Sequence, residues 1–523
     1  MRFSDPSQYI MDEPEKGIFR VHRDVYTDPD LFEMELKNVF EGTWVYLCHE
    51  SQVQNPFDFY CTKIGRRSVI VSRDENGELH AFFNTCRHRG ATLCQTETGN
   101  TKYHVCNYHG WAYDASGKNI DIKDKAQGCY TEAFDEQDHN LIPLPCFDSY
   151  QGLIFASLNP DVPSLDEHLG EAKILLDLVA EQSPEGMEVV PGRSDYTYNA
   201  NWKMQMDNGM DPYHLTSTHS TFMKVVQRRQ DGDSDNEQVT SPDFRDRFTM
   251  DAGMYTFKNG HRMIWNDHPK PETMPFWGMI EEVRKKVGDE KAKWMARSRN
   301  ITIFPNLQFN DSTSLVLRTY IPHAPNRTEM KVYSFAPVNE PDEFRTIRVR
   351  QHEDFFNSSG MATPDDTICY SDCQEGYMSY PADYLQSFER GMANLIEGPD
   401  EEAKRLGFKP ATSLFGNFMD QGETSYHGPY RQWARLMRAG TILTSRLPQS
   451  KSEKHAQPRH AGRRCGPTVP RRPLYRHAAL GRMDRPLPRG CHILGTCLAQ
   501  RRRAYGRHTP RNIFILFRQP SRY

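Results

Sequence analysis

Short apolar runs separated by turn residues dominate the chain from residue 44 to about residue 159, a pattern typical of β-strands. The clearest runs cover residues 57–64, 68–72 and 153–157, and the Asp-Glu-Asn-Gly sequence at 74–77 predicts a tight turn. We therefore expect a small all-β unit of roughly 115 residues, which is a common domain size.

The hydrophobic period changes to that of helices at residue 164. Ser164 and Glu167 have the S-x-x-E spacing of a capping box, and a helix with one apolar side is expected to follow. Two further helices and two strand regions are expected, at residues 202–219, 342–357, 301–321 and 330–337. The second unit, about 160–440, is therefore predicted to be α+β. The segment before both units, residues 1–44, is expected to be partly helical.

Length and composition limit the class of protein. A chain of 523 residues is too long for one hydrophobic core, so two or more folded units are expected. No apolar run of about 18 residues is present, which predicts no membrane span, and the acidic start has no apolar core like that of a secretory leader. The twelve scattered cysteines do not resemble a disulfide framework, so we expect a reduced, cytoplasmic protein.

The net charge of -4 conceals a strong asymmetry along the chain. Residues 441–523 contain 19 Lys and Arg against 2 Asp and Glu, whereas residues 1–440 contain 46 against 67. The acidic body thus carries a net charge of -21 and the tail a net charge of +17. Clustered arginines suggest a nucleic-acid-binding arm as a first interpretation of the tail.

Two short motifs in the β unit combine cysteine with histidine. Cys86 and His88 form a C-x-H pair, and seventeen residues after His88 comes the C-x2-H pair of Cys106 and His109. A zinc site is the alternative. In zinc fingers, however, one motif contributes two cysteines and the other two histidines, whereas each pair here contributes one thiolate and one imidazole. This suits a [2Fe-2S] cluster in which two cysteines bind one iron and two histidines the other, the Rieske arrangement.

A second candidate metal site lies in the α+β unit, where His214 and His219 follow several acids. Residues five apart lie about 140° apart around a helix, so a regular helix would not aim both imidazoles inward. Pro212 perturbs this stretch, and the two imidazoles converge if the helix loosens near His219. Two histidines and one carboxylate form the recurrent site of non-haem iron oxygenases. Asp365 and Asp366, after a Gly/Pro break, are the candidate carboxylates, and a helix N-cap is their alternative role.

The two motifs together resemble the large (α) subunit of Rieske non-haem iron ring-hydroxylating oxygenases. The resemblance covers about residues 15–440 and rests on the Rieske pairs followed by N-W-K-x4-N-G-x-D-x-Y-H-x4-H. Local phrases such as Asp-Phe-Phe-Asn at 354–357 are similar to the benzoate, toluate, anthranilate and 2-halobenzoate dioxygenase branch.

The resemblance implies the fold, the domains and the metal ligands. The fold is expected to be α+β, with a Rieske domain at 45–160 and a helix-grip-like catalytic domain of antiparallel sheet and helices at 161–440, on which the segment 1–44 packs. The cluster ligands implied are Cys86, His88, Cys106 and His109. The ligands implied for the mononuclear Fe(2+) are His214, His219 and Asp366, with Asp366 preferred over Asp365. Asp211 takes the position of the acid that links a cluster histidine of one subunit to an iron-ligand histidine of the next, and Asn208 lies near the open side of the iron.

The resemblance also implies a function and partners. The chain is expected to hydroxylate an aromatic carboxylate with O2 and two electrons, giving a cis-dihydrodiol or a derived catechol. The expected partners are a small β subunit in an α3β3 assembly and a separate NADH-dependent flavin and iron–sulfur reductase. One alternative is an oxygenase that converts a chlorinated aryloxyacetate to a phenol. The other is a Rieske electron carrier without oxygenase activity, although small carriers lack the second histidine motif.

Candidate substrate contacts follow from the general form of a binding pocket, which is mainly apolar with a few polar anchors. Met206, Met210 and Phe222 are the candidate walls, together with the strand residues around 307–317, and Arg318 is a candidate anchor for a carboxylate.

The tail has no counterpart in this resemblance, which ends near residue 433. A catabolic oxygenase has no evident use for nucleic acid or membrane binding, so neither is expected. The tail is rich in Arg, Pro, His and Cys and contains only two lysines. Because out-of-frame reading of GC-rich DNA gives such a composition, we expect residues 441–523 to be a frameshift-derived, poorly ordered extension.

Overall fold

The structure of the chain is a computed structural model, and it describes residues 1–230, 249–418 and 422–445. The described residues belong to one compact unit. Most of the segment 441–523, expected to be a dispensable tail, lies outside the described residues, although the last helix, α15 (His427–Ser445), continues into its first residues. Among the described residues, no helix is long and apolar enough to cross a membrane.

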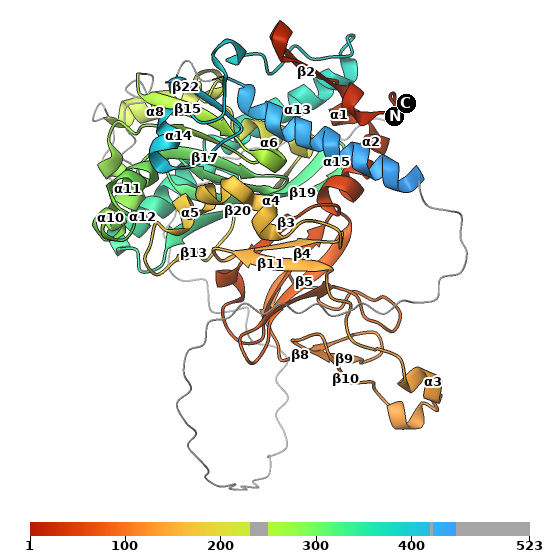
Figure 1. Ribbon diagram of the computed structural model, residues 1–523. Helices are drawn as coiled ribbons and strands as arrows, with labels where there is room; N and C mark the ends of the chain where they lie inside the picture. Colours follow the sequence, from red (N-terminus) through yellow and green to blue (C-terminus); the bar gives the residue numbers. More distant parts are fainter. Residues whose placement is uncertain (231–248, 419–421, 446–523) are drawn as a thin grey trace, which may run out of the picture. The chain divides into compact units, whose positions relative to one another are not determined.

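The all-β unit predicted after residue 44 is confirmed, and it consists of three small antiparallel sheets (Figure 1). The strand order is β6-β5-β4-β7 in one sheet, β10-β9-β8 in the second and β11-β12-β3 in the third. Their bounds are β3 (Val45–His49), β4 (Asp58–Ile64), β5 (Arg67–Arg73), β6 (Leu79–Phe83), β7 (Thr98–Asn100), β8 (Tyr103–Val105), β9 (Ala112–Asp114), β10 (Asn119–Asp121), β11 (Cys146–Tyr150) and β12 (Leu153–Ser157). A short helix, α3 (Glu132–Asp135), interrupts the chain before β11.

A ten-stranded antiparallel sheet organises the second unit (Figure 1). Its order is β13-β20-β19-β18-β17-β16-β15-β22-β21, and β14 also pairs with β20. The bounds are β13 (Met187–Val189), β14 (Tyr196–Tyr198), β15 (Asp251–Thr256), β16 (Arg262–Asn266), β17 (Ser298–Ile303), β18 (Leu307–Asp311), β19 (Leu315–Ala324), β20 (Arg327–Pro337), β21 (Ile396–Glu397) and β22 (Thr412–Asn417). The central strands are buried over most of their length, so both sheet faces are covered.

Helices cover this sheet and carry the candidate ligands, so the predicted α+β class is correct. One group, α10, α11 and α12, lies beside the sheet in Figure 1, and α12 packs against β20. The bounds are α4 (Leu165–Leu169), α5 (Lys173–Ala180), α6 (Trp202–Asn208), α7 (Leu215–Thr218), α8 (Ser220–Gln230), α10 (Ile280–Val287), α11 (Asp289–Met295), α12 (Asp342–Gln351), α13 (Thr363–Ser379) and α14 (Glu401–Leu406). The predicted capping box is present at α4, where Ser164 and Glu167 exchange hydrogen bonds.

The helix expected across residues 202–219 is wrong as one continuous element. It ends at Asn208, and after a loop the short helix α7 begins at Leu215. The helix expected across 342–357 is α12 followed by a π-helical turn at His352–Phe356. Both differences occur where the chain turns toward the candidate iron site.

The N-terminal segment is only partly helical, as expected. It contains a hairpin of β1 (Ile10–Glu13) and β2 (Ile18–Val21) and then α1 (Asp24–Thr27) and α2 (Pro29–Glu35). Glu35 on α2 is fully buried and accepts hydrogen bonds from the indoles of Trp202 and Trp433 and from Lys203. One carboxylate therefore joins the N-terminal segment to α6 and α15.

Candidate metal centres

The two Cys/His motifs of the β unit form two loops with the same backbone geometry. The backbone N–H of Cys86 donates to the carbonyl of Ala91, and the carbonyl of Cys86 accepts from the N–H of Gly90. Cys106 makes the equivalent backbone hydrogen bonds with Trp111 and Gly110. Gly90 and Gly110 have φ of 72° and 74°, values that favour glycine. The turns thus present the two motifs as a matched pair.

These loops bring the predicted ligands together in two pairs, His88 with His109 and Cys86 with Cys106. The Nδ1 atoms of His88 and His109 lie 3.0 Å apart at the protein surface. Cys86 and Cys106 are both buried, and burial raises the pKa of Cys86, with the neighbouring Cys106 adding to the effect. The Tyr113 hydroxyl lies 3.3 Å from Sγ of Cys86.

This set fits a Rieske cluster better than a zinc ion. Two buried sulfurs and two outward imidazoles form separate pairs, as two irons with different ligands require. The Tyr113 hydroxyl beside a ligand sulfur adds a hydrogen bond of the kind that tunes such clusters.

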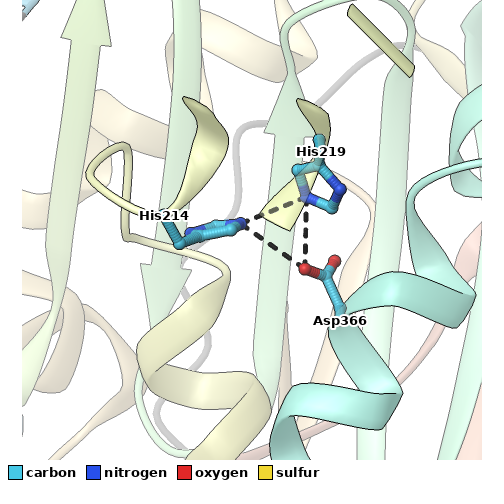
Figure 2. Close-up of side chains that lie close together, drawn as sticks. All are labelled: His214, His219 and Asp366. Carbon is cyan, nitrogen blue, oxygen red and sulfur yellow. Dashed lines mark hydrogen bonds and ion pairs between the residues drawn. The ribbon is translucent and has the colours of Figure 1, made fainter. Parts of the chain in front are cut away.

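The second centre consists of His214, His219 and Asp366, whose side chains point toward one another in Figure 2. The two Nε2 atoms lie 3.2 Å apart. The Asp366 Oδ1 lies 3.4 Å from Nε2 of His214 and 3.2 Å from Nε2 of His219. The three donor atoms thus form a nearly equilateral triangle.

The break between α6 and α7 makes this convergence possible. After Asn208 the chain passes through Gly209, where a Cβ would come within 2.6 Å of the Gln308 side chain. His214 and His219 then lie at the two ends of α7, and Asp366 comes from the first turn of α13. A continuous helix would have pointed the two imidazoles in different directions.

The triangle has the dimensions of one face of a metal site. Metal–donor bonds of about 2.1 Å that meet at about 90–110° would separate their donors by roughly 3.0–3.4 Å. Burial opposes the charged form of His214, but Asp211 and Asp366 outweigh it and raise the pKa of His214 to about 10. Burial would raise the pKa of Asp366, but the imidazoles of His214 and His219 hold it well below its usual range. Both pKa shifts arise because carboxylates and imidazoles lie next to one another at this site.

The structure separates the two candidate acids. Asp365 lies on the other side of His219, with Oδ2 3.6 Å from Nδ1, and it is partly exposed. Its carboxylate does not belong to the triangle, so the geometry favours Asp366.

Asn208 and Asp211 both lie beside the triangle. Asn208 places Nδ2 3.2 Å from Oδ1 of Asp366 and 3.3 Å from Nε2 of His214. Asp211 places Oδ2 3.3 Å from Nδ1 of His214 and accepts a hydrogen bond from the amide of Tyr213. A carboxylate at Nδ1 holds the proton there and leaves Nε2 free for a metal.

A pocket with roughly 100 Å³ of internal space lies against the triangle. Its floor is a row of residues on three paired strands, Ile264, Asn300 and Asn310, and aromatic walls come from Phe355 and Phe356. The guanidinium of Arg318 also lines it, as the sequence suggested.

The predicted apolar walls are placed differently. Met206 and Met210 are buried in the main hydrophobic core, and Phe222 is buried beside Phe355, one layer behind the pocket. The strand residues expected around 307–317 do line the pocket through Asn310, whereas sequence reasoning missed Asn300 and the aromatic pair after α12. Asparagines that occur in otherwise apolar strands were the signal for the floor, because a buried amide requires a polar neighbour or a ligand.

Comparisons with known proteins agree with this geometry. The Rieske [2Fe-2S] domain family matches residues 43–147, and the family described as "Ring hydroxylating alpha subunit (catalytic domain)" matches residues 187–439. The 2-halobenzoate 1,2-dioxygenase large subunit of Burkholderia cepacia is 39% identical, covering 83% of this chain and 92% of that protein. The toluate 1,2-dioxygenase subunit alpha of Pseudomonas putida is 40% identical, covering 77% and 88%.

A solved structure resembles the fold as well. Naphthalene 1,2-dioxygenase from Rhodococcus sp., bound to indole, matches with a TM-score of 0.68 and 26% identity, covering 80% of this chain and 94% of that chain. The chain therefore belongs to the ring-hydroxylating dioxygenase α subunits, oxidoreductases with a Rieske [2Fe-2S] cluster and a mononuclear iron.

Proposed function

We propose that this protein is the terminal oxygenase subunit of a multicomponent dioxygenase that hydroxylates an aromatic carboxylate. The observation that carries the proposal is the triangle of His214, His219 and Asp366 beside a small pocket with aromatic walls. The relatives named as 2-halobenzoate, toluate and anthranilate dioxygenases support the substrate class, at 37% to 40% identity.

The size of the pocket supports a substrate with one aromatic ring. Its internal space of roughly 100 Å³ is of the same order as the engineered cavity of about 150 Å³ that binds benzene in another protein.

We assign the two cofactors to the residues predicted from the sequence. Cys86, His88, Cys106 and His109 would hold the cluster, and His214, His219 and Asp366 would hold the iron. When bound, the cluster supplies single electrons and the iron activates dioxygen. Around the iron, Asn208 orients Asp366 through its amide, and Asp211 holds the proton of His214 on Nδ1.

Asp211 is further assigned as a link between copies of the chain. Within the described part of one chain its carboxylate contacts His214 and the amide of Tyr213, and neither cluster histidine. The imidazole of His88 is exposed, and Asp211 is partly exposed. Both are thus accessible for a hydrogen bond between neighbouring α subunits.

The proposal includes partners and domains. We propose a small β subunit in an α3β3 assembly and an NADH-dependent reductase, because the relatives are named as large or alpha subunits of multicomponent systems. We propose functional domains at 1–44, 45–160 and 161–440.

The test is oxygen uptake by the purified protein with a reductase of the same class. Benzoate, anthranilate, salicylate and a chlorophenoxyacetate would be supplied in parallel, and products would be separated by chromatography. We expect uptake matched by formation of a cis-diol or catechol from an aromatic acid. Uptake only with the aryloxyacetate, yielding a phenol, would contradict the proposed substrate.

Two variants test the residue assignments. His214→Ala should retain about two of three irons per chain and lose turnover, because the cluster ligands are untouched. Asp211→Ala should retain all the iron and lose product formation. Normal turnover of Asp211→Ala would refute the link between subunits.

A further inference from the structure

Arg318 differs from every other buried arginine in the described part of the chain. Arg262, Arg297, Arg299 and Arg348 are equally buried, and each lies within 4.0 Å of a carboxylate. The Arg318 side chain is 6% exposed, yet among the described residues no carboxylate lies within that distance. Its Nε has no hydrogen-bond partner, as is also true of Arg262 and Arg299. A buried, unpaired charge is costly, which indicates a site that is completed by something else.

The groups around Arg318, among the described residues, are an aromatic ring, an imidazole and a phenol. Its guanidinium lies 4.8 Å from the centre of the Phe356 ring. Burial, with a smaller effect from Arg318, lowers the pKa of His352 to about 4, so this imidazole is uncharged at neutral pH. Burial raises the pKa of the nearby Tyr196 to about 12, so this phenol is also uncharged. None of these groups supplies a negative charge.

The same guanidinium faces the pocket of the iron site. Arg318 lines this pocket together with Asp366, the residue that closes the ligand triangle. Asp366 is not available as its partner, because its carboxylate lies within 3.4 Å of both imidazoles. Since no carboxylate of the described residues pairs with Arg318, the pocket offers this guanidinium to an anionic ligand.

We propose that Arg318 binds the carboxylate of the substrate and thereby fixes which edge of the ring faces His214, His219 and Asp366. This inference rests on the proposed function and deepens it, because it assigns the residue that recognises the acid. The planar guanidinium suits two parallel hydrogen bonds to a carboxylate, and the adjacent Phe356 ring suits stacking against an aryl group.

The test measures binding without turnover, by calorimetry on the oxidised protein with benzoate and with its neutral analogue benzamide. Arg318→Met should weaken benzoate binding about 10- to 100-fold, the range expected for lost hydrogen bonds to a charged group. Benzamide binding should change less than about threefold. Arg318→Lys should give an intermediate loss for benzoate, because the charge remains but the planar fork is lost.

Thermal unfolding separates a ligand anchor from a structural arginine. Arg318→Met should retain or raise the melting temperature of the ligand-free protein, because it removes an unpaired buried charge. The matched control is Arg348→Met, which leaves Glu340 buried without its partner and should lower the melting temperature. Destabilisation of both variants to the same extent would overturn the proposal.

The outcomes distinguish this inference from the proposed function. If the wild-type protein binds benzoate and Arg318→Met binds it equally well, the anchor is refuted and the proposed function stands. If the wild-type protein neither binds nor converts any aromatic carboxylate, the proposed function fails, and the anchor fails with it.

Discussion

Asp207, near the end of α6 and just before the loop that leads to His214, has a raised pKa. Burial raises its pKa to about 7, against the lowering effects of Arg262 and of the hydrogen bond from Tyr430. The Tyr430 hydroxyl donates to Oδ2 at 2.6 Å and Arg262 lies 3.9 Å away, but these two contacts do not offset the cost of burying the charge. The folded protein therefore takes up a proton at Asp207 that the unfolded chain does not hold.

This difference predicts a pH-dependent stability. Folding raises the pKa of Asp207 from 3.8 to about 7. The contribution of Asp207 to the free energy of unfolding is therefore fully present below pH 4 and is lost as the pH rises to 7. The variant Asp207→Asn lacks this pH dependence. The difference in free energy of unfolding, variant minus wild type, should therefore increase by about 1.4 kcal/mol per pH unit between pH 5 and pH 7. Urea denaturation at pH 5, 6 and 7 measures the gain, with the exposed Asp161→Asn as control. A constant difference between variant and wild type would contradict the prediction.

At the scale of residues, the sequence was most informative where chemistry restricts the residue type. Cluster and iron ligands belong to few residue types, so their motifs predicted Cys86 and His214, and the structure brings each beside its predicted partners. Pocket walls are ordinary apolar residues, and nothing local distinguishes Met206 in the core from Phe355 in the wall. The unpaired state of Arg318 depends on neighbours from distant elements, which no local pattern reports.

At the scale of elements, one buried ion pair joins three segments that are far apart in the sequence. Lys203 on α6 and Glu35 on α2 are both fully buried, with Nζ and Oε1 2.5 Å apart. Trp433 on α15 donates its indole hydrogen to the same carboxylate. The helix that leads to the iron loop is therefore held by both the beginning and the end of the folded unit.

Lys203→Met should destabilise the protein strongly, because it leaves the Glu35 carboxylate buried without its cation. The expected loss is about 3–5 kcal/mol in the free energy of unfolding. The double variant Glu35→Gln with Lys203→Met removes both charges and should recover part of that loss. Guanidinium denaturation of the single and double variants measures it, and equal stability of the two variants would contradict the argument.

Element types were predictable from hydrophobic period, but breaks inside elements were not. The strands at residues 57–64 and 301–321 and the helix after Ser164 follow simple periodicity. The break between α6 and α7 depends on tertiary contacts, since Gly209 packs against Gln308 and its carbonyl accepts from Asn300. Sequence alone indicated that Pro212 perturbs the stretch and placed the loosening near His219, whereas α6 already ends at Asn208.

At the scale of the whole molecule, the chain divides by net charge into an acidic body, residues 1–440, and a basic segment after residue 440. The body contains both metal centres, while the described chain ends at Ser445 in α15. Residues 446–523 lie outside the described part, so the frameshift origin of the segment stays a prediction.

A chain that ends at Gln449 should therefore retain its iron content, its turnover and its melting temperature, because every contact described above lies before that residue. Iron analysis and calorimetry of the shortened chain measure this. A chain that ends at Pro429 serves as the control, since it lacks Trp433 and should unfold at a lower temperature. Loss of iron from the longer variant would show that the basic segment has a structural role.

The hydrogen bond between Asn300 and Gly209 has a consequence for changing the range of substrates. Asn300 lies on the pocket floor, so it is an attractive position for enlarging the pocket, but its amide donates at 2.9 Å to the loop that carries His214. Substitution there would alter the shape of the pocket and the placement of a metal ligand in one step. Among the described residues, neither Arg318 nor Phe356 makes a hydrogen bond to that loop. Directed evolution toward new aromatic substrates should thus accumulate changes around Arg318 and Phe356 and leave Asn300 intact.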